Sequence, residues 1–477
     1  MTRSYVCFSP DKMRLLCYVL LLFAVQAPAR AQTEQLQIIV GAINPKVVCR
    51  SNPAESYALY LPAQFSTNRE WPIIYVFDPL ARGEAAAEVV RPAAQKLGYI
   101  VAASNNSKNG PDGGSREAAI AMWDDTQLRL PVDPRRRYVA GMSGGSRVAT
   151  SVALSCGDCV AGVIANAAGF PPDAAPPHPM KFAYFAAVGD ADFNYPEFVR
   201  LRRKLDRAGA RYRIRVFEGP HGWAPTEVWM EALNWMDIQA MASGTLPRAT
   251  ARIAASLQET FAGARAFESA NEPLAAFREY EAAVRDFSGL ADVGAAKAKL
   301  AELEKSNELK AAEKQEAADV EEQERIVKNP SIQMQKLATG DLDASGFSEL
   351  LASISSLKRK AQPATRKNLV LRRAQIQLAM YAYESGQSCL TKKNYDTALS
   401  FFHLAAAGAN KPGAAHYERA RIFAIQSHKQ KMLTELRLAL ASGYHEPAAL
   451  DEAEFQPYRA DPKFKELTAE WTKAERR

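Results

Sequence analysis

The chain has 477 residues, which is too long for one ordinary hydrophobic core and is a natural length for two or three domains. Its composition, 47% hydrophobic and 24% charged, is that of a globular protein. The formal net charge of +7 is spread over the whole chain, and no dense block of Lys and Arg with interleaved aromatic residues occurs. Nucleic acid is therefore not an expected partner.

Residues 1–31 have the pattern of a secretory signal peptide. Basic residues precede an apolar run from Leu15 to Val25, and Ala29 and Ala31 form a small-x-small motif before Gln32. The apolar run is too short to span a bilayer comfortably. We therefore expect a periplasmic or secreted protein that keeps no stable membrane span after cleavage. An uncleaved membrane anchor is the alternative.

Strand-like and helix-like segments alternate through residues 35–245. Two runs, at residues 160–169 and 182–190, are continuously apolar, as expected of strands that are buried on both faces. Repeated strand–helix units after two or three opening strands predict an α/β fold, with a mostly parallel sheet covered by helices on both faces. The other predicted strands are residues 35–41, 56–62, 72–78, 99–105, 136–142 and 211–219, and the predicted helices are residues 83–98 (broken near Pro92), 116–130, 145–156, 198–209 and 227–241.

From Thr250 onward strand signals nearly disappear, which predicts an all-helical region. Residues 297–330 are mixed-charge helix formers without a strong core stripe, so we expect an exposed helix or a spacer there. The predicted domains are an α/β domain over residues 32–245, a helical region with one repeat-like unit and the charged helix over residues 246–330, and helical repeats over residues 331–477.

A spacing of 34 residues recurs in the last of these regions. Thirty-four residues is the period of tetratricopeptide repeats, and the pattern A-x3-F-x2-A resembles the second helix of such a repeat. Ordinary amphipathic helices without a repeat array are the alternative. The matching positions are Ala398, Phe402 and Ala405 with Met432, Leu436 and Ala439, and Ala276, Tyr280 and Ala283 show the same internal spacing out of phase.

The segment from Gly141 to Gly145, "GMSGG", joins a predicted strand to a predicted helix. A G-x-S-x-G pattern in this context is typical of a nucleophile elbow, in which the serine stands exposed on a strained turn. The residues two before and two after the serine must be small, because the strand end and the helix start lie close together. We predict Ser143 as the nucleophile and the Gly144 N–H as one donor of an oxyanion hole. A coincidental glycine-rich loop is the alternative.

In this kind of fold an acid and then a histidine follow the serine along the chain. His221 lies in "FEGPHGW" directly after the last predicted strand, whereas His178 lies in a proline-rich loop, so His221 is the predicted general base. The acid should follow the preceding strand, where both Asp190 and Asp192 occur. Asp192 is the predicted acid because of its G-x-x-D spacing from Gly189, and Asp190 is the alternative. The acid would hold the imidazole in one tautomer.

The second oxyanion donor is expected in the loop "DPLARG", which follows the third predicted strand. Pro79 has no N–H, so Leu80 is the predicted donor and Ala81 is the alternative. Asp78 begins this loop, and the sequence offers no explanation for a negative charge near an oxyanion hole.

The runs "SYALYLP", "WPIIYVFDPLARG", "YIVAASNNSKNGP", "GMSGGSR", "VGDADFNY" and "GPHGW" resemble dienelactone-hydrolase and polyhydroxybutyrate-depolymerase-like esterases of the α/β-hydrolase superfamily, over residues 35–245. The resemblance implies an α/β-hydrolase fold with a Ser–His–Asp triad on Ser143, His221 and Asp192. True dienelactone hydrolases have a Cys nucleophile, which is absent here, so that activity is not expected. The C-terminal part resembles tetratricopeptide repeats, which implies a protein-binding surface.

These expectations lead to an exported serine hydrolase that cleaves small or polymeric esters through an acyl-enzyme, without a cofactor or metal. The alternatives are a serine peptidase of the same fold and a periplasmic tetratricopeptide scaffold with a vestigial hydrolase domain. Only the short connection from Gly169 to Met180 separates two predicted strands, so we expect an open, shallow site without a large cap at that point.

Four cysteines remain after the predicted leader: Cys49, Cys156, Cys159 and Cys389. Three pairings are possible, and the sequence does not choose among them. The C-x-x-C pair Cys156 and Cys159 has no thioredoxin-like context, so a structural disulfide or free thiols are expected there rather than redox catalysis.

Overall fold

The computed structural model describes residues 38–110, 114–446 and 449–475. The predicted signal peptide therefore lies outside the described residues. By its internal contacts the chain from Ile39 to Arg477 forms one compact unit. Within the described ranges, every helix is too short or too polar to cross a lipid bilayer.

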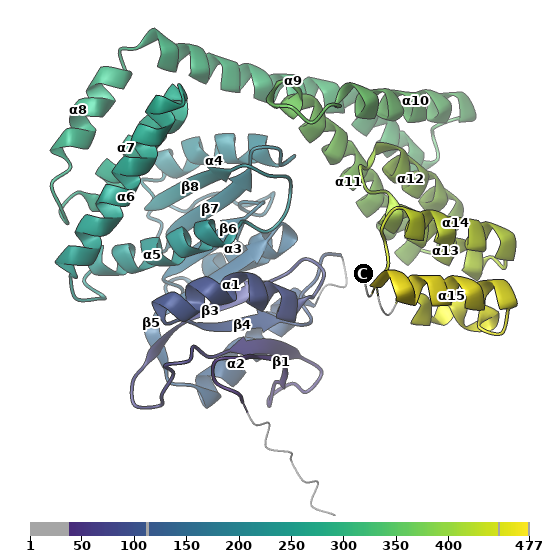
Figure 1. The fold of residues 1–477 in the computed structure, drawn as a ribbon, viewed down its shortest axis with the longest axis horizontal. Coiled ribbons are helices and arrows are strands. Elements are labelled where there is room, and N and C mark those ends of the chain that lie inside the picture. The colour runs from purple at the N-terminus through teal and green to yellow at the C-terminus, as the bar shows by residue number, and fades with distance from the viewer. Residues whose placement is uncertain (1–37, 111–113, 447–448, 476–477) are drawn as a thin grey trace, which may run out of the picture. The chain divides into compact units, whose positions relative to one another are not determined.

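A sheet of eight strands in the order β1-β2-β4-β3-β5-β6-β7-β8 forms the first part of this unit (Figure 1). β1 and β2 run antiparallel to their neighbours, and the strands from β4 to β8 pair in parallel. Four of the parallel strands, β3, β4, β6 and β7, are buried along their whole length, as the apolar runs of the sequence predict. The strands are β1 (Ile43–Val48), β2 (Ser56–Tyr60), β3 (Trp71–Phe77), β4 (Ile100–Ser104), β5 (Val132–Met142), β6 (Gly162–Asn166), β7 (Ala183–Gly189) and β8 (Tyr212–Phe217).

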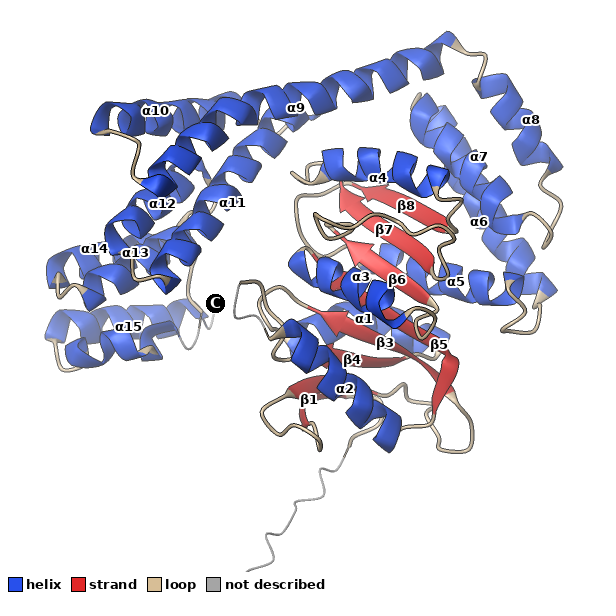
Figure 2. Cartoon of the chain, turned by 180° about the vertical axis from the view of Figure 1, so that it is seen from behind, coloured by secondary structure: helices blue, strands red, loops and turns tan. Residues whose placement is uncertain are grey.

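Helices cover both faces of the sheet. Figure 1 shows α1 and α5 in front of the strands, and Figure 2, seen from behind, shows α2 and α3 on the opposite face. The helices of this part are α1 (Gly83–Leu97), α2 (Ser115–Arg129), α3 (Gly144–Cys156), α4 (Tyr195–Arg207) and α5 (Thr226–Ala242).

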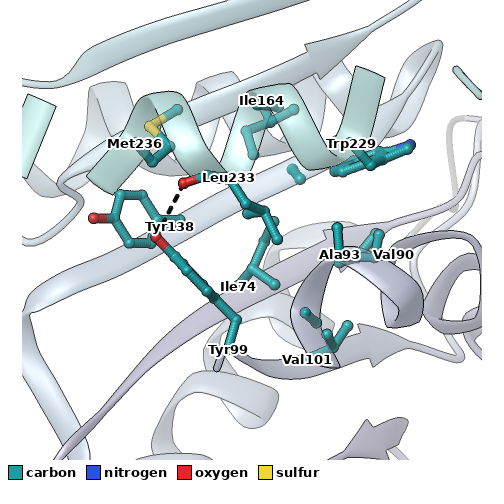
Figure 3. Close-up of a cluster of buried hydrophobic side chains, with 14 of the residues drawn as sticks. Ile74, Val90, Ala93, Tyr99, Val101, Tyr138, Ile164, Trp229, Leu233 and Met236 are labelled. Carbon is teal, nitrogen blue, oxygen red and sulfur yellow. Dashed lines mark hydrogen bonds between the residues drawn. The ribbon is translucent and has the colours of Figure 1, made fainter. Parts of the chain in front are cut away.

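The main hydrophobic core lies between the sheet and the pair α1 and α5 (Figure 3). Ile74 of β3 and Ile164 of β6 meet Trp229 and Leu233 of α5 there, and all four side chains are buried. Burying one such side chain stabilises the fold by roughly 1.5–3 kcal/mol. Tyr99 is also fully buried and satisfies its hydroxyl by donating to Asp237 Oδ1 at 2.6 Å.

Two details of the sheet region differ from the sequence prediction. The first strand is Ile43–Val48 rather than residues 35–41. In the described part of the predicted strand, Ile39 is 60% exposed and lies outside the sheet. β1 is an edge strand with a register irregularity, so it tolerates Pro45. The predicted break at Pro92 was also wrong. α1 continues through it, and Pro92 lies on the exposed side of the helix.

After this sheet the described residues form only helices and their connections, which confirms the predicted order of a mostly parallel α/β sheet followed by an all-helical region. Short 3-10 segments at Arg366–Asn368, Ala449–Asp451 and Ala453–Tyr458 join some of these helices. The helices are α6 (Thr250–Ser269), α7 (Pro273–Phe287), α8 (Gly294–Leu303), α9 (Asn307–Thr339), α10 (Ala344–Lys360), α11 (Leu369–Thr391), α12 (Tyr395–Gly408), α13 (Gly413–Ile425), α14 (Lys429–Ala441) and α15 (Pro462–Glu475).

The charged segment predicted as an exposed helix or spacer forms α8 and most of α9. α9 runs without interruption through Pro330, so the predicted domain boundary at that residue falls inside one helix. Val320, Gln323 and Val327 are buried, so α9 packs along one side although most of its residues are polar.

The positions of the predicted repeat lie on packed helix pairs. α11 packs on α12 and α13 packs on α14, and all six matched positions on α12 and α14 are buried. Gly386 of α11 faces Phe402, and a Cβ at Gly386 would lie 2.8 Å from the Phe402 ring. The assignment to tetratricopeptide repeats stays a prediction.

The last strand is tied to α7 by a buried arginine. Arg213 of β8 forms ion pairs with Glu231 of α5 at 2.7 Å and with Glu279 and Asp286 of α7 at 2.8 and 3.2 Å. A hydrophobic cluster with members from α5, α6 and α7, among them Met241, lies in the same region. Packing therefore continues across the boundary predicted near residue 245.

Candidate active site

Ser143 occupies a strained turn between β5 and α3. Its backbone angles are φ 54° and ψ −121°, a conformation that non-glycine residues rarely adopt. The Ser143 N–H donates to Asn166 O at 2.8 Å, which holds the turn against β6. A Cβ at Gly141 would lie 2.3 Å from the Gly145 carbonyl, and a Cβ at Gly145 would lie 2.0 Å from Phe77 O. Both positions therefore require glycine, as a nucleophile elbow does.

The structure brings His221 and Asp192 together. His221 Nδ1 lies 2.9 Å from Asp192 Oδ1 and 3.0 Å from Oδ2. The Asp192 side chain is completely buried, and its Oδ1 also accepts the Asn194 N–H at 2.8 Å. Because Nδ1 faces a carboxylate, it carries the proton, and Nε2 of a neutral imidazole is left as an acceptor. The Ser143 hydroxyl makes no hydrogen bond to any described residue.

The two alternative residues have other partners. Asp190 Oδ1 accepts the Gly219 N–H at 3.0 Å, so Asp190 braces the loop that precedes His221. His178 Nδ1 lies 2.9 Å from Ala208 O, at the end of α4. The structure therefore places neither residue in the pairing that it gives to Asp192 and His221.

The predicted oxyanion donors differ in their hydrogen bonding. The Gly144 N–H lies at the N-terminus of α3 and has no acceptor among the described residues. The Leu80 N–H donates to Asp78 Oδ1 at 2.8 Å, and the alternative donor, the Ala81 N–H, donates to Asp78 O at 3.2 Å. The positive end of the α3 dipole and the free amide at Gly144 favour an anion beside Ser143.

Asp78 is a buried hub between two loops, which explains the charge that the sequence left without a role. Its carboxylate accepts two hydrogen bonds of 3.0 Å from the Arg82 guanidinium and one of 3.2 Å from Trp223 Nε1. Trp223 follows His221 by two residues. Asp78 therefore joins the loop after β3 to the loop that carries His221.

Asn109 packs against the elbow, which the sequence did not predict. A Cβ at Gly144 would lie 1.8 Å from Asn109 Oδ1, so glycine leaves the space that this amide occupies. The Asn109 N–H donates to Pro79 O at 2.8 Å, and this bond attaches the loop after β4 to the loop after β3. The sequence gives one indication of this contact: the two loops follow consecutive predicted strands.

Two helices of the C-terminal region reach the loop that carries Asp192. Gln323 of α9 donates to Phe193 O at 2.9 Å, and the Phe193 ring lies 4.3 Å from the His221 ring, centroid to centroid. Arg373 of α11 donates through Nε to Asp190 O at 2.6 Å. The connection between β6 and β7 is short, as predicted, and does not form a large cap. The segments that reach the loop carrying Asp192 are α9 and α11.

α11 also places a carboxylate in electrostatic range of His221. Desolvation by the surrounding protein raises the pKa of Glu384, and the charge of a protonated His221 and that of Arg147 oppose this rise. The Glu384 side chain is nevertheless exposed, so it stays in contact with water. Arg147 itself is held by Glu197, with its Nη2 at 2.8 Å from Oε2.

Cys156 and Cys159 form a disulfide at the C-terminal end of α3. Cys49 and Cys389 are free, and burial raises the pKa of the Cys49 thiol to about 12. A thiol with that pKa is a poor nucleophile. Among the described residues no group of three or more His, Cys, Asp or Glu side chains is arranged to hold a metal ion.

The chain matches no model of a known protein family and no curated protein. Solved structures with a related fold include an S-formylglutathione hydrolase from Staphylococcus aureus, at 14% identity and a TM-score of 0.31 over 38% of this chain and 90% of that one. A ferulic acid esterase has 18% identity and a TM-score of 0.34 over 40% and 93%. An esterase from Pyrobaculum calidifontis has 14% identity and a TM-score of 0.35 over 43% and 87%.

Proposed function

We propose that the chain is an exported serine hydrolase that cleaves ester bonds, with Ser143, His221 and Asp192 as its triad. The observation that carries the proposal is the strained Ser143 turn at the end of β5, combined with the His221–Asp192 pair at the ends of β8 and β7. Parallel strands of one sheet present their carboxyl ends at one edge, which is where α/β hydrolases assemble their residues.

The proposed reaction proceeds through an acyl-enzyme. Ser143 Oγ attacks the ester carbonyl carbon while His221 Nε2 takes the hydroxyl proton. The carbonyl oxygen becomes an oxyanion that accepts a hydrogen bond from the Gly144 N–H. Collapse of the intermediate expels the alcohol, which receives the proton from Nε2. Water, deprotonated by the same nitrogen, then attacks the acyl-enzyme. The bond between Ser143 Oγ and the acyl carbon breaks, Oγ regains the proton from Nε2, and the carboxylic acid is released.

The neighbours of this set have supporting roles in the proposal. The Asp192 carboxylate, out of contact with water, holds Nδ1–H and stabilises the imidazolium that forms in each half-reaction. Leu80 would act as a second oxyanion donor by sharing its N–H between Asp78 and the substrate, since Asp78 accepts that N–H in the free protein. No cofactor takes part in these steps.

Location and partners belong to the same proposal. Residues 1–31 would direct export to the periplasm or the medium, where the Cys156–Cys159 disulfide is stable. The pairs α11–α12 and α13–α14, with their 34-residue offset, would form tetratricopeptide-like units that bind a protein partner.

A fluorophosphonate probe tests the nucleophile directly. We expect the probe to label the folded full chain once, on the peptide that contains Ser143, and not to label Ser143→Ala. Parallel assays with p-nitrophenyl acetate and with peptide p-nitroanilides separate an esterase from a peptidase. Absence of labelling and of both activities in folded protein would refute the proposal and favour the scaffold alternative.

A further inference from the structure

An open cavity of about 1140 Å³ lies beside the proposed catalytic loops. Its walls come from β8, the ends of α6 and α7, α9, and the segment that leads into α11. Asp190 and Tyr195 line it, whereas Ser143 and His221 do not. The cavity is therefore a separate space that borders both loops of the proposed active site, the one that carries Asp192 and the one that leads to His221.

Two of the arginines that line this cavity have no carboxylate partner among the described residues. Six arginines and five carboxylates line it. Most of the arginines have carboxylate partners, which are Glu279 for Arg215 at 2.7 Å, Glu316 for Arg278 at 2.5 Å, Glu272 for Arg366 at 2.7 Å and Glu281 for Arg202 at 3.6 Å. Arg372 and Arg373 have no carboxylate partner among the described residues.

Arg373 is buried, with 5% of its surface exposed. Its Nε donates to Asp190 O at 2.6 Å, and its guanidinium lies 3.8 Å above the Tyr195 ring. The two Nη groups donate to no acceptor among the described residues, although Arg373 lines the cavity. Neither Nη group is among the fully buried atoms without a partner, so both are open to the cavity and available to an acceptor that enters it.

Asp190, Asp319 and Glu316 lie close enough to act on the charge of Arg373, but none of these carboxylates forms an ion pair with it. Both oxygens of Glu316 are occupied by Arg278, and Oε1 also accepts the Tyr195 hydroxyl at 2.6 Å. Burial lowers the pKa of Arg373, and surrounding negative charge does not fully offset this effect. An anion that enters the cavity would compensate the buried charge.

The remaining wall of the cavity is apolar. Phe267, Leu274 and Leu369 from three helical segments and Ile214 and Val216 from β8 line it. A small inorganic anion would leave this surface in contact with water, whereas an organic body would cover it. Arg373 is the one buried arginine of the cavity wall without a carboxylate partner among the described residues, and a single guanidinium matches one carboxylate.

We propose that this cavity binds an organic monocarboxylate, with the carboxylate on the Nη groups of Arg373 and the apolar body against Phe267 and Leu274. A guanidinium presents paired donors that match a carboxylate. Arg372 supplies a second positive charge at the entrance. The proposal concerns binding alone and does not depend on the proposed hydrolase activity.

Titration calorimetry with the full chain tests the proposal. We expect hexanoate to bind, and neutral hexanamide and inorganic phosphate to bind more weakly. Arg373→Met keeps the length of the side chain above Tyr195 but removes the donors, and it should raise the Kd for hexanoate about tenfold or more. Arg203→Gln, on the exposed side of α4 and outside the cavity, is the matched control and should leave the Kd unchanged.

Two outcomes would overturn the proposal. One is an unchanged Kd for hexanoate in folded Arg373→Met. The other is loss of binding in Ser143→Ala, which would put hexanoate in the proposed catalytic site instead. If Arg373→Met does not fold, Arg372→Gln replaces it, because that side chain is only partly buried. A wild-type Kd in folded Arg372→Gln would equally refute the proposal.

Discussion

Trp223 Nε1 donates a hydrogen bond of 3.2 Å to the buried carboxylate of Asp78, so the loop that carries His221 is fastened to the loop after β3. Asp78→Asn replaces one acceptor oxygen by a donor and leaves either Trp223 or Leu80 without its acceptor. We expect the free energy of unfolding to fall by about 1–3 kcal/mol, measured by urea denaturation.

The control for Asp78→Asn is Glu88→Gln. Glu88 pairs with Arg91 on the exposed face of α1, so its removal should change the free energy of unfolding by less than about 0.5 kcal/mol. Equal effects in the two variants would contradict the hub role of Asp78.

The two aspartates after β7 provide a matched pair of variants. Asp192→Asn should lower kcat for an ester by roughly 10⁴-fold, because an amide beside Nδ1 favours the wrong imidazole tautomer. Asp190→Asn should lower kcat by less than about tenfold, since it weakens only the bond to the Gly219 N–H. Steady-state kinetics of both variants decide the matter. The reverse order of effects would identify Asp190 as the acid.

Glycine-to-alanine changes at two helix positions should have opposite effects on stability. Gly145→Ala puts a methyl group 2.0 Å from Phe77 O, so β3 or α3 must shift, and we expect a loss of roughly 2 kcal/mol or more. Gly263→Ala lies within α6, where nothing stands within 4 Å of the new Cβ. It should stabilise by about 0.5–1 kcal/mol, because alanine has the higher helix propensity.

Thermal and urea unfolding of both glycine variants give the comparison. A Gly145→Ala protein as stable as the wild type would show that the turn at Ser143 is not as tightly packed as the structure has it.

Glu384→Gln should move the acid limb of the pH profile of kcat/KM to lower pH. The ionised Glu384 carboxylate stabilises the positive charge of the His221 imidazolium, which is the inactive form of a general base. Without that charge the imidazole stays neutral down to a lower pH, and we expect a displacement of about 0.2–0.5 pH unit. The effect requires ionised Glu384, so it weakens below the raised pKa of that carboxyl.

Exposed Glu349 on α10 offers the control for this measurement, since Glu349→Gln removes the same charge far from the catalytic loops in sequence. Added salt should reduce the displacement in Glu384→Gln, because the carboxylate is in contact with water. A profile that does not move, or that moves to higher pH, would exclude an electrostatic role for Glu384.

Local patterns sufficed to predict the elements that position the site. Ser143 lies between a strand and a helix, and His221 and Asp192 follow strands, so simple alternation located all three near strand ends. The distinction between Asp190 and Asp192 rested on spacing, and in the structure only Asp192 faces the His221 ring.

Contacts between segments that are distant in the chain could not be predicted from the sequence. Nothing in the local pattern around Gln323 indicates that its amide meets Phe193 O, because a polar residue on a charged helix is usually solvated. The role of Asp78 was hidden for the same reason, since Trp223 is remote in sequence. Local rules also failed at Pro92, where α1 continues through a proline on its exposed side.

The ion pairs of Arg213 bear on how the chain can be cut or recombined. A fragment that stops near residue 245 would keep Arg213 and Glu231 but lose Glu279 and Asp286, and it would uncover the apolar side of Met241. An arginine buried with one carboxylate instead of three is strongly destabilising. A fragment that contains the sheet therefore has to include α7, and a fragment that ends before α7 should aggregate on expression.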